Sequence, residues 1–303
     1  MLRLLQSNQP AAWVIVPLMA ALLWGLASVG VGESGPDLEE GLGFLGILAS
    51  ARMIHMAHLE SRMRTRPTSI PGWVFVLWAI PFLPSSSFRL WWSGFFVLAA
   101  LRQALRISEE ESGRNAALFW MGVHLGVAGL LWTSMALWAL LLPLGCVGLR
   151  PFRPAETLSL LLGFAVSWGV LPALTWLLRT PLPLWEAVPE SPWEPWLVLP
   201  WLVFGATGWL LRQQSLARAT ARQRTARRLT QWVAAGGLLL SALGVMERTG
   251  PDWSHHALFA GGLFCAWTIG WCFPPRWKGT QWVPWVLVAL AMASAVWPWL
   301  SWG

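Results

Sequence analysis

Residues 101–153 read LRQALRISEEESGRNAALFWMGVHLGVAGLLWTSMALWALLLPLGCVGLRPFR, a long apolar run between two basic ends. No charged residue occurs from 116 to 149, and one helix over that run would be roughly 50 Å long. The hydrocarbon core of a bilayer is about 30 Å thick and takes about 20 helical residues. We therefore predict a helical hairpin that turns near Gly129 to Ser134, where Trp132 and Thr133 suit a membrane interface.

The rest of the chain has the composition of a membrane protein. Of its 303 residues, 56% are hydrophobic and only 12% are charged, which excludes a soluble domain with a single core. The polar connections between apolar runs are too short to hold a separate soluble domain. We predict a single integral membrane domain over residues 1–303, of the all-α class.

We predict a polytopic helical bundle of about eleven spans. The first span is the apolar run from Ala11 to about Gly30, which is longer than the apolar core of a signal peptide. The others are residues 41–58, 71–83, 88–105, 116–129, 131–148, 157–178, 195–211, 229–246, 255–272 and 281–300. Residues 71–83 are short and bounded by Pro71, Pro81 and Pro84, so both a full span and a re-entrant segment fit them.

The basic residues predict the orientation. With the N-terminus in the cytoplasm and the C-terminus outside, all of the 21 Arg and Lys residues except Arg89, Arg179 and Arg248 fall on the inner side. If residues 116–149 formed one span, everything downstream would change sides and this bias would disappear. Helix length and charge therefore predict the same hairpin independently.

Several segments carry a resemblance to a known family: the opening SNQPAAWVIVPL, then LRQAL, ISEEESGR, FWMGVHLGVAGLLW and LRPFRPAETLSLLLGF. Together they resemble a family of uncharacterised polytopic inner-membrane proteins of Bacteroidota, over most of the first 180 residues. The family often has an acid where this chain has Trp120. The resemblance implies a multi-pass protein of the bacterial inner membrane, and it implies no activity.

Small residues predict where helices pack closely. Gly122 and Gly126 are four residues apart and form a small-xxx-small face, and Gly41, Gly43 and Gly46 suggest a second one. The chain also has 26 tryptophans, of which many fall at predicted span ends, as in an aromatic belt. We interpret those inside spans as packing residues rather than as a pigment or quinone site.

Carboxylates follow the first predicted span on the outer side. Asp37, Glu39 and Glu40 are the candidate catalytic residues, because enzymes that transfer sugars from polyprenyl carriers commonly have a general base in such a loop. The loop has about ten residues, short for an enzyme of this kind.

Ionisable residues inside predicted spans suggest a binding site. Arg52 and His55 lie on the second span and His124 on the first arm of the hairpin, where a charge is costly and often functional. These residues could bind a small anionic or lipid-like substrate of a transporter. Arg52 is also close enough to the helix end to snorkel to the interface. His124 lacks further ligands at metal-binding spacing, so we predict no metal site.

Two loops suggest contacts with lipid or saccharide. Trp185, Glu190 and Trp193 lie in a long outer loop whose indoles and carboxylates suit a saccharide or lipid head group, and equally suit an interfacial turn. On the inner side, the segment LRQQSLARATARQRTARRL predicts an amphipathic helix on anionic lipid. Its lipid-surface residues are Arg218, Arg222, Arg224, Arg227 and Arg228.

The sequence contains no phosphate-binding GxxxxGK[ST], no HExxH and no nucleophile elbow, which disfavours an ATPase, a zinc protease and a serine hydrolase. We predict no cofactor, and we interpret the basic loops as topology signals rather than as a nucleic-acid site. The leading hypothesis is an accessory or assembly component of the cell envelope, whose partners are the bilayer, its anionic lipids and other membrane proteins. The alternatives are an enzyme acting on polyprenyl-linked glycan at the outer face, and a transporter.

Overall fold

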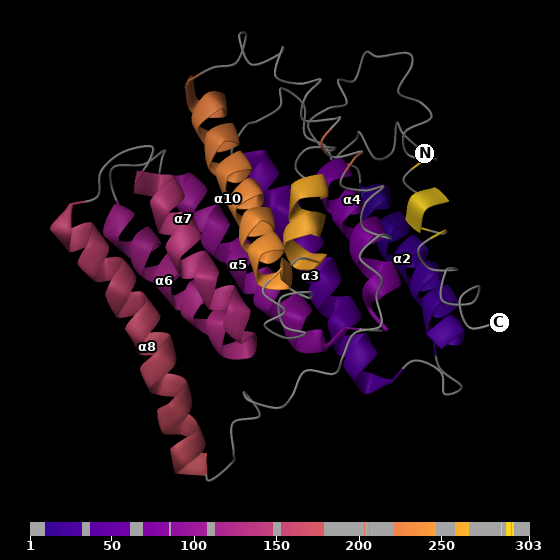
Figure 1. Ribbon diagram of the computed structural model, residues 1–303, viewed down its shortest axis with the longest axis horizontal. Coiled ribbons are helices and arrows are strands. Elements are labelled where there is room, and N and C mark those ends of the chain that lie inside the picture. Colours follow the sequence, from indigo (N-terminus) through magenta and orange to yellow (C-terminus); the bar gives the residue numbers. More distant parts are fainter. Residues whose placement is uncertain are drawn as a thin grey trace.

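The computed structural model is built of helices (Figure 1). It describes residues 10–31, 37–60, 69–84, 86–107, 113–147, 153–178, 203, 206, 221–246, 258–266, 286, 289–291 and 293. No β-strand occurs among these residues, so the predicted all-α class is confirmed for them. The elements are α2 (Pro10–Val31), α3 (Leu38–Glu60), α4 (Ile70–Ala79), η1 (Ile80–Phe82), α5 (Phe88–Ile107), α6 (Arg114–Leu131), η2 (Thr133–Leu137), α7 (Trp138–Val147), α8 (Pro154–Leu178) and α10 (Ala221–Met246).

One helix of the described part, α3, is long and apolar enough to cross a membrane by length and composition. Three shorter apolar helices cover Ile70–Phe82, Ser134–Val147 and Pro154–Val170. The number of spans and their orientation therefore stay predictions. The predicted spans at 195–211 and 281–300 lie almost wholly outside the described residues.

The long apolar run has a break in its helix at the place where the hairpin turn was predicted. Helix α6 ends at Leu131, and Trp132 has extended backbone angles of φ −150° and ψ 109° before the 3-10 helix η2 begins. Gly129 lies against Ala136, because a Cβ on Gly129 would be only 3.0 Å from the Ala136 Cβ. The apolar run is therefore not one continuous helix, and the break that its length predicted is confirmed.

Helices α3, α5, α6 and α8 lie side by side in that order (Figure 1). Helix α3 runs parallel to α5, since Gly46 near the start of α3 lies against Trp91 near the start of α5, while Glu60 at its end contacts Arg102. Helix α6 runs antiparallel to α5, with the Ser93 hydroxyl donating to the Ala128 carbonyl at 2.8 Å. The chain between α3 and α5 therefore returns from one end of the bundle to the other.

The short helix α4 lies on that return path and is entirely buried. Proline near its first turn suits the helix start, because its missing N–H would have no helical partner there. Gly72 lets α4 approach α3, since a Cβ at this position would lie 2.7 Å from the Ala51 carbonyl oxygen. The Trp78 indole donates to the Leu258 carbonyl at 3.0 Å. The segment that fitted two interpretations in the sequence is thus a central packing element.

The centre of the bundle is aromatic. Trp78, Trp91 and Trp138 are fully buried, and the Phe259 ring lies edge-on to Trp138 at 5.9 Å between centroids and to Phe75 at 6.1 Å. Phe259 belongs to the helical residues 258–266, which are far in sequence from these partners. Aromatic pairs of this kind add to the energy of apolar burial. Trp138, inside a predicted span, packs in the core, as interpreted from the sequence. Trp91 lies at a predicted span end, where an aromatic belt was expected, and it is buried in the core as well.

Charged residues gather at the ends of the helices. Helices α3 and α5 end at the same side of the bundle where α6 and α8 begin. Helix α10 also begins there, because it runs antiparallel to α7. Gly145 near the end of α7 lies against Leu229, and Trp138 at its start lies against Gly237. We call this side of the bundle the arginine end. The arginines of the described ranges at this end are Arg102, Arg106, Arg114, Arg153, Arg222, Arg224, Arg227 and Arg228. At the opposite end, the described charged residues are Asp37, Glu39, Glu40 and Arg89.

Candidate functional site

The candidate catalytic carboxylates have structural partners. The Asp37 carboxylate accepts from the Glu40 backbone N–H at 2.8 Å, and the Asp37 carbonyl accepts from the Gly41 N–H at 3.1 Å, so Asp37 caps the start of α3. Glu40 accepts from the Trp24 indole and from the Ser28 hydroxyl, both at 2.8 Å, and so links α3 to α2. Glu39 is exposed. Two of the three carboxylates therefore hold the helix start and the α2–α3 contact.

The residues proposed for a transport site do not converge. On α3, Arg52 is exposed, whereas His55 and its neighbour in the next turn, His58, are fully or almost fully buried. His124 lies on α6, partly buried between the rings of Phe96 and Trp120, each 6.2 Å away. Helix α5 separates α3 from α6 (Figure 1). The structure therefore places these residues on helices that α5 separates, and a shared site for Arg52, His55 and His124 stays a prediction.

Within the described part of the chain, no three His, Cys, Asp or Glu residues are grouped so that they could hold a metal ion. Cys146 and Cys265 are both buried free thiols.

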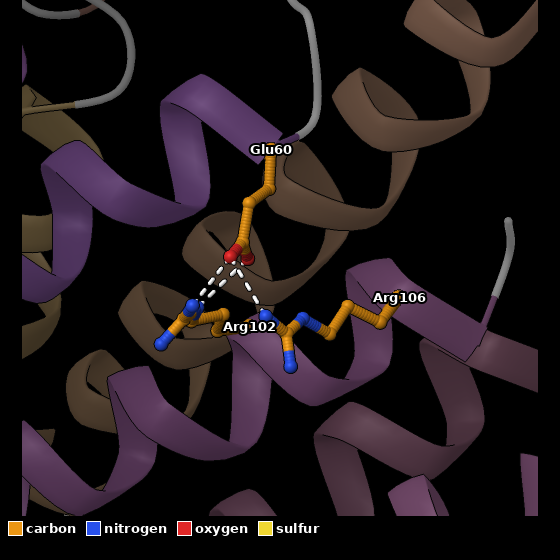
Figure 2. Close-up of polar contacts among 3 residues, drawn as sticks. All are labelled: Glu60, Arg102 and Arg106. Atoms are coloured by element: carbon orange, nitrogen blue, oxygen red, sulfur yellow. Dashed lines mark hydrogen bonds and ion pairs between the residues drawn. The ribbon is translucent and has the colours of Figure 1, made fainter. Parts of the chain in front are cut away.

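A charged cluster that the sequence did not suggest joins α3 to α5 at the arginine end. Figure 2 shows the Glu60 carboxylate between the guanidinium groups of Arg102 and Arg106. Arg102 donates through Nε at 2.7 Å and also through Nη2, and Arg106 donates through Nη2 at 2.9 Å. The two arginines are four residues apart on α5, and so lie on one helical face. Arg102 binds the Glu60 carboxylate through two nitrogens, and this bidentate geometry constrains the end of α3 relative to α5.

A cavity opens beside this cluster, between the end of α5 and the start of α6. Its volume is about 390 Å³, within the range of ligand pockets, and its polar lining includes Gln103, Arg106 and Arg114. Arg114 donates to the Ile107 carbonyl at 3.3 Å and lies 3.9 Å from the Glu156 carboxylate. The carboxylates of Glu60 and Glu156 contact Arg106 and Arg114, which line the cavity. The charges at this cavity are thus mixed and do not favour a ligand of either sign.

The described part of the basic segment near residue 220 is the start of a long helix. Helix α10 runs without a break from Ala221 to Met246, so it joins Arg222, Arg224, Arg227 and Arg228 to the predicted span at 229–246. Arg224 and Arg228 are exposed. The basic segment and the span are therefore parts of one helix, and contact of its arginines with anionic lipid stays a prediction.

The other predicted site residues, Trp185, Glu190, Trp193 and Arg218, lie outside the described residues. Comparisons of the chain with known protein families, with curated proteins and with solved structures find no match.

Proposed function

We propose that this protein is a polytopic component of the bacterial inner membrane, with about eleven spans and its N-terminus inside, that serves in the accessory or assembly machinery of the cell envelope. The family of uncharacterised Bacteroidota membrane proteins that it resembles is part of this proposal. The observation that carries it is the apolar surface of α8.

Helix α8 buries one narrow stripe and exposes apolar side chains on the rest of its circumference. Its buried residues, Glu156, Leu160, Gly163 and Ser167, recur at helical spacing and face α6. Its exposed large apolar residues are Leu158, Leu161, Leu162, Val166, Trp168, Val170, Trp176 and Leu177. Soluble monomers rarely expose so large a continuous apolar patch, whereas lipid chains or a partner's transmembrane helix cover it without cost. At 25 residues, α8 is about 37 Å long, which by length alone exceeds a bilayer core, and its apolar stretch covers Pro154–Val170.

The charge distribution supports the proposed orientation. The described ends of α5, α6, α8 and α10 bring eight arginines to one end of the bundle, against Arg89 at the other. The positive-inside rule assigns such an end to the cytoplasm. The parallel course of α3 and α5 supports a crossing, rather than a re-entrant, interpretation of residues 71–83.

Isosteric replacement of the three outer carboxylates separates an assembly role from a catalytic one. The triple variant Asp37→Asn, Glu39→Gln, Glu40→Gln should retain full function. Asn caps a helix as well as Asp does, and the amide oxygen that Glu40→Gln introduces can still accept from Trp24 and Ser28. A general base would lose its proton acceptor in this variant.

The measurement is complementation of a deletion strain, whose envelope glycans and lipids are compared with those of its parent, at equal membrane abundance of the variant. A triple variant that accumulates normally yet matches the deletion would overturn the accessory role in favour of the enzyme. Asp37→Ala is the matched control: it removes the cap and should lower abundance by destabilising α3, by roughly 1 kcal/mol.

Cysteine labelling tests the number and direction of the spans. In a background without Cys146, Cys265 and Cys272, the variants Ser34→Cys and Ser191→Cys should react with an impermeant thiol reagent in intact cells, and Ser215→Cys should react only after the membrane is opened. Labelling of Ser215→Cys in intact cells would contradict the eleven-span topology.

A further inference from the structure

We propose that one face of α10 binds an anionic phospholipid of the inner leaflet, with the lipid lying along the helix. This inference rests on the proposed membrane location and adds a defined ligand site to it. The site, which we call the α10 stripe, consists of Arg224, Arg228, Trp232, Ala235 and Leu239.

The α10 stripe is a single exposed face. Its residues are separated by four, four, three and four positions, which keeps them on one side of an α-helix, and all are exposed, with Trp232 at 53% and Leu239 at 63%. The opposite side of α10 is buried through Ala226, Leu229, Thr230, Val233, Ala234 and Gly237. The stripe is therefore the surface that α10 presents to its surroundings.

Along the stripe, the side chains change in the order that a phospholipid requires. Arg224 and Arg228 come first, Trp232 follows about 6 Å deeper, and Leu239 lies about 10 Å beyond it. One leaflet contributes about 15 Å of hydrocarbon, so these distances match a phosphate, a glycerol region and an acyl chain in turn. Tryptophan prefers the middle level, where an apolar ring meets polar groups.

The neighbouring helix extends the apolar part of the site. The Trp232 indole lies over Gly145 of α7, where a Cβ would come within 2.8 Å of the ring. Leu144 and Val147, close to Gly145 in α7, are themselves exposed, at 57% and 44%. Glycine at this position lets the indole come close to α7, so that the two helices share one apolar surface below the arginines.

Charge selects an anionic lipid. The sequence from 195 to 246 contains six arginines and no Asp or Glu, and the elements packed against α10 in the described part of the chain, which are α7 and residues 258–266, carry no charged residue. This distinguishes the α10 stripe from the cavity at Arg106 and Arg114, where carboxylates balance the arginines. Each arginine near an anionic surface strengthens binding by about fivefold at low salt. Two of them acting on one phosphate, partly screened, should give roughly a tenfold preference.

The test uses photoactivatable phosphatidylglycerol and phosphatidylcholine, each with the reactive group on an acyl chain. The full-length protein is placed in phosphatidylcholine nanodiscs containing one or the other probe, and the label on the peptide that begins after Arg228 and contains Trp232 and Leu239 is measured by mass spectrometry. We expect roughly tenfold more label from phosphatidylglycerol. Added salt should reduce that ratio, and excess soluble glycerol phosphate should not, because it lacks the acyl chain.

The variant Arg224→Gln, Arg228→Gln should bring the ratio close to one. The matched control, Arg52→Gln, Arg153→Gln, removes two exposed arginines outside the stripe and should leave the ratio unchanged. A wild-type ratio near one, in protein that stays in the nanodisc, would overturn the lipid site and leave the stripe as a surface for an acidic protein. Protein that leaves the bilayer fraction on alkaline washing would instead contradict the membrane location itself.

Discussion

Replacing Gly163 with leucine should separate α8 from α6 and lower the free energy of unfolding by roughly 3 kcal/mol. A Cβ on Gly163 would overlap the Phe119 carbonyl oxygen and lie 2.9 Å from the carbonyl carbon and 3.0 Å from the Val123 nitrogen. These are backbone atoms of a helix, which cannot rotate away as a side chain could. The whole of α8 would have to move outward.

That outward movement would break more than one contact. Gly122 lies against the Leu160 carbonyl in the same way, and the Ser167 hydroxyl donates to the Val123 carbonyl at 2.9 Å. In the proposed membrane location, lipid chains are as apolar as the side chains they replace, so close packing contributes to the attraction between helices and its loss is not compensated by the hydrophobic effect.

Gly169→Leu is the matched control, on the same helix and with the same change of side chain. Nothing lies within 4 Å of a Cβ at Gly169, so this variant should be neutral or slightly stabilising, since leucine has the higher helix propensity. Both variants are compared by titration of the reconstituted protein with a denaturing detergent. Equal midpoints for Gly163→Leu and Gly169→Leu would contradict the packing of α6 against α8.

The sequence predicted one side of this contact and could not predict the other. The spacing of Gly122 and Gly126 indicates a face for close packing, but it does not say which of many apolar helices meets that face. In the second predicted face, Gly43 and Gly46 pack against Leu83 and Trp91, while Gly41 meets nothing within 4 Å. A small residue permits close approach, and only the tertiary fold decides whether it is used.

The short segment at 71–83 was ambiguous for a similar reason. Its prolines and its length fit a helix that crosses only part of a membrane, and the sequence does not reveal that α3 and α5 are parallel. The contact of Gly72 with the Ala51 carbonyl and the bond from Trp78 to Leu258 join it to segments far apart in the chain. Such long-range partners leave no periodic signal in the segment itself.

The candidate site was predicted less well than the fold. The sequence groups Arg52, His55 and His124 because all three lie inside predicted spans. Position within a span does not specify which way a side chain points, or which other helix lies between two spans. The sequence does not indicate a role for Glu60, because it lies two residues beyond the predicted span end at His58, where an acid resembles an ordinary loop residue. Arginines four apart, Arg102 and Arg106, were the available signal that a carboxylate would lie opposite them.

Replacing Glu60 with alanine should lower the free energy of unfolding by about 2 kcal/mol. The change leaves Arg102 and Arg106, which both donate to the carboxylate, facing each other without an acceptor (Figure 2). Removing one partner of a fully buried ion pair costs about 3–5 kcal/mol. The side chain of Glu60 is 25% exposed and that of Arg102 is 22% exposed, so water partly screens the charges that remain. We therefore expect a cost below that of a fully buried pair.

A double-mutant cycle identifies the cause. Arg102→Ala in the Glu60→Ala background removes the repulsion that Glu60→Ala creates, so the two changes together should cost less than the sum of the single changes, by about 1 kcal/mol or more. The stability of Glu60→Gln should fall between those of wild type and Glu60→Ala, because one amide oxygen can accept fewer of the hydrogen bonds that Arg102 and Arg106 donate. Glu39→Ala, an exposed glutamate in the first turn of the same helix, should change stability by less than about 0.5 kcal/mol. If the costs of Glu60→Ala and Arg102→Ala simply add, the cluster does not couple α3 to α5, and the register of these helices must depend on the glycine contacts at their opposite ends.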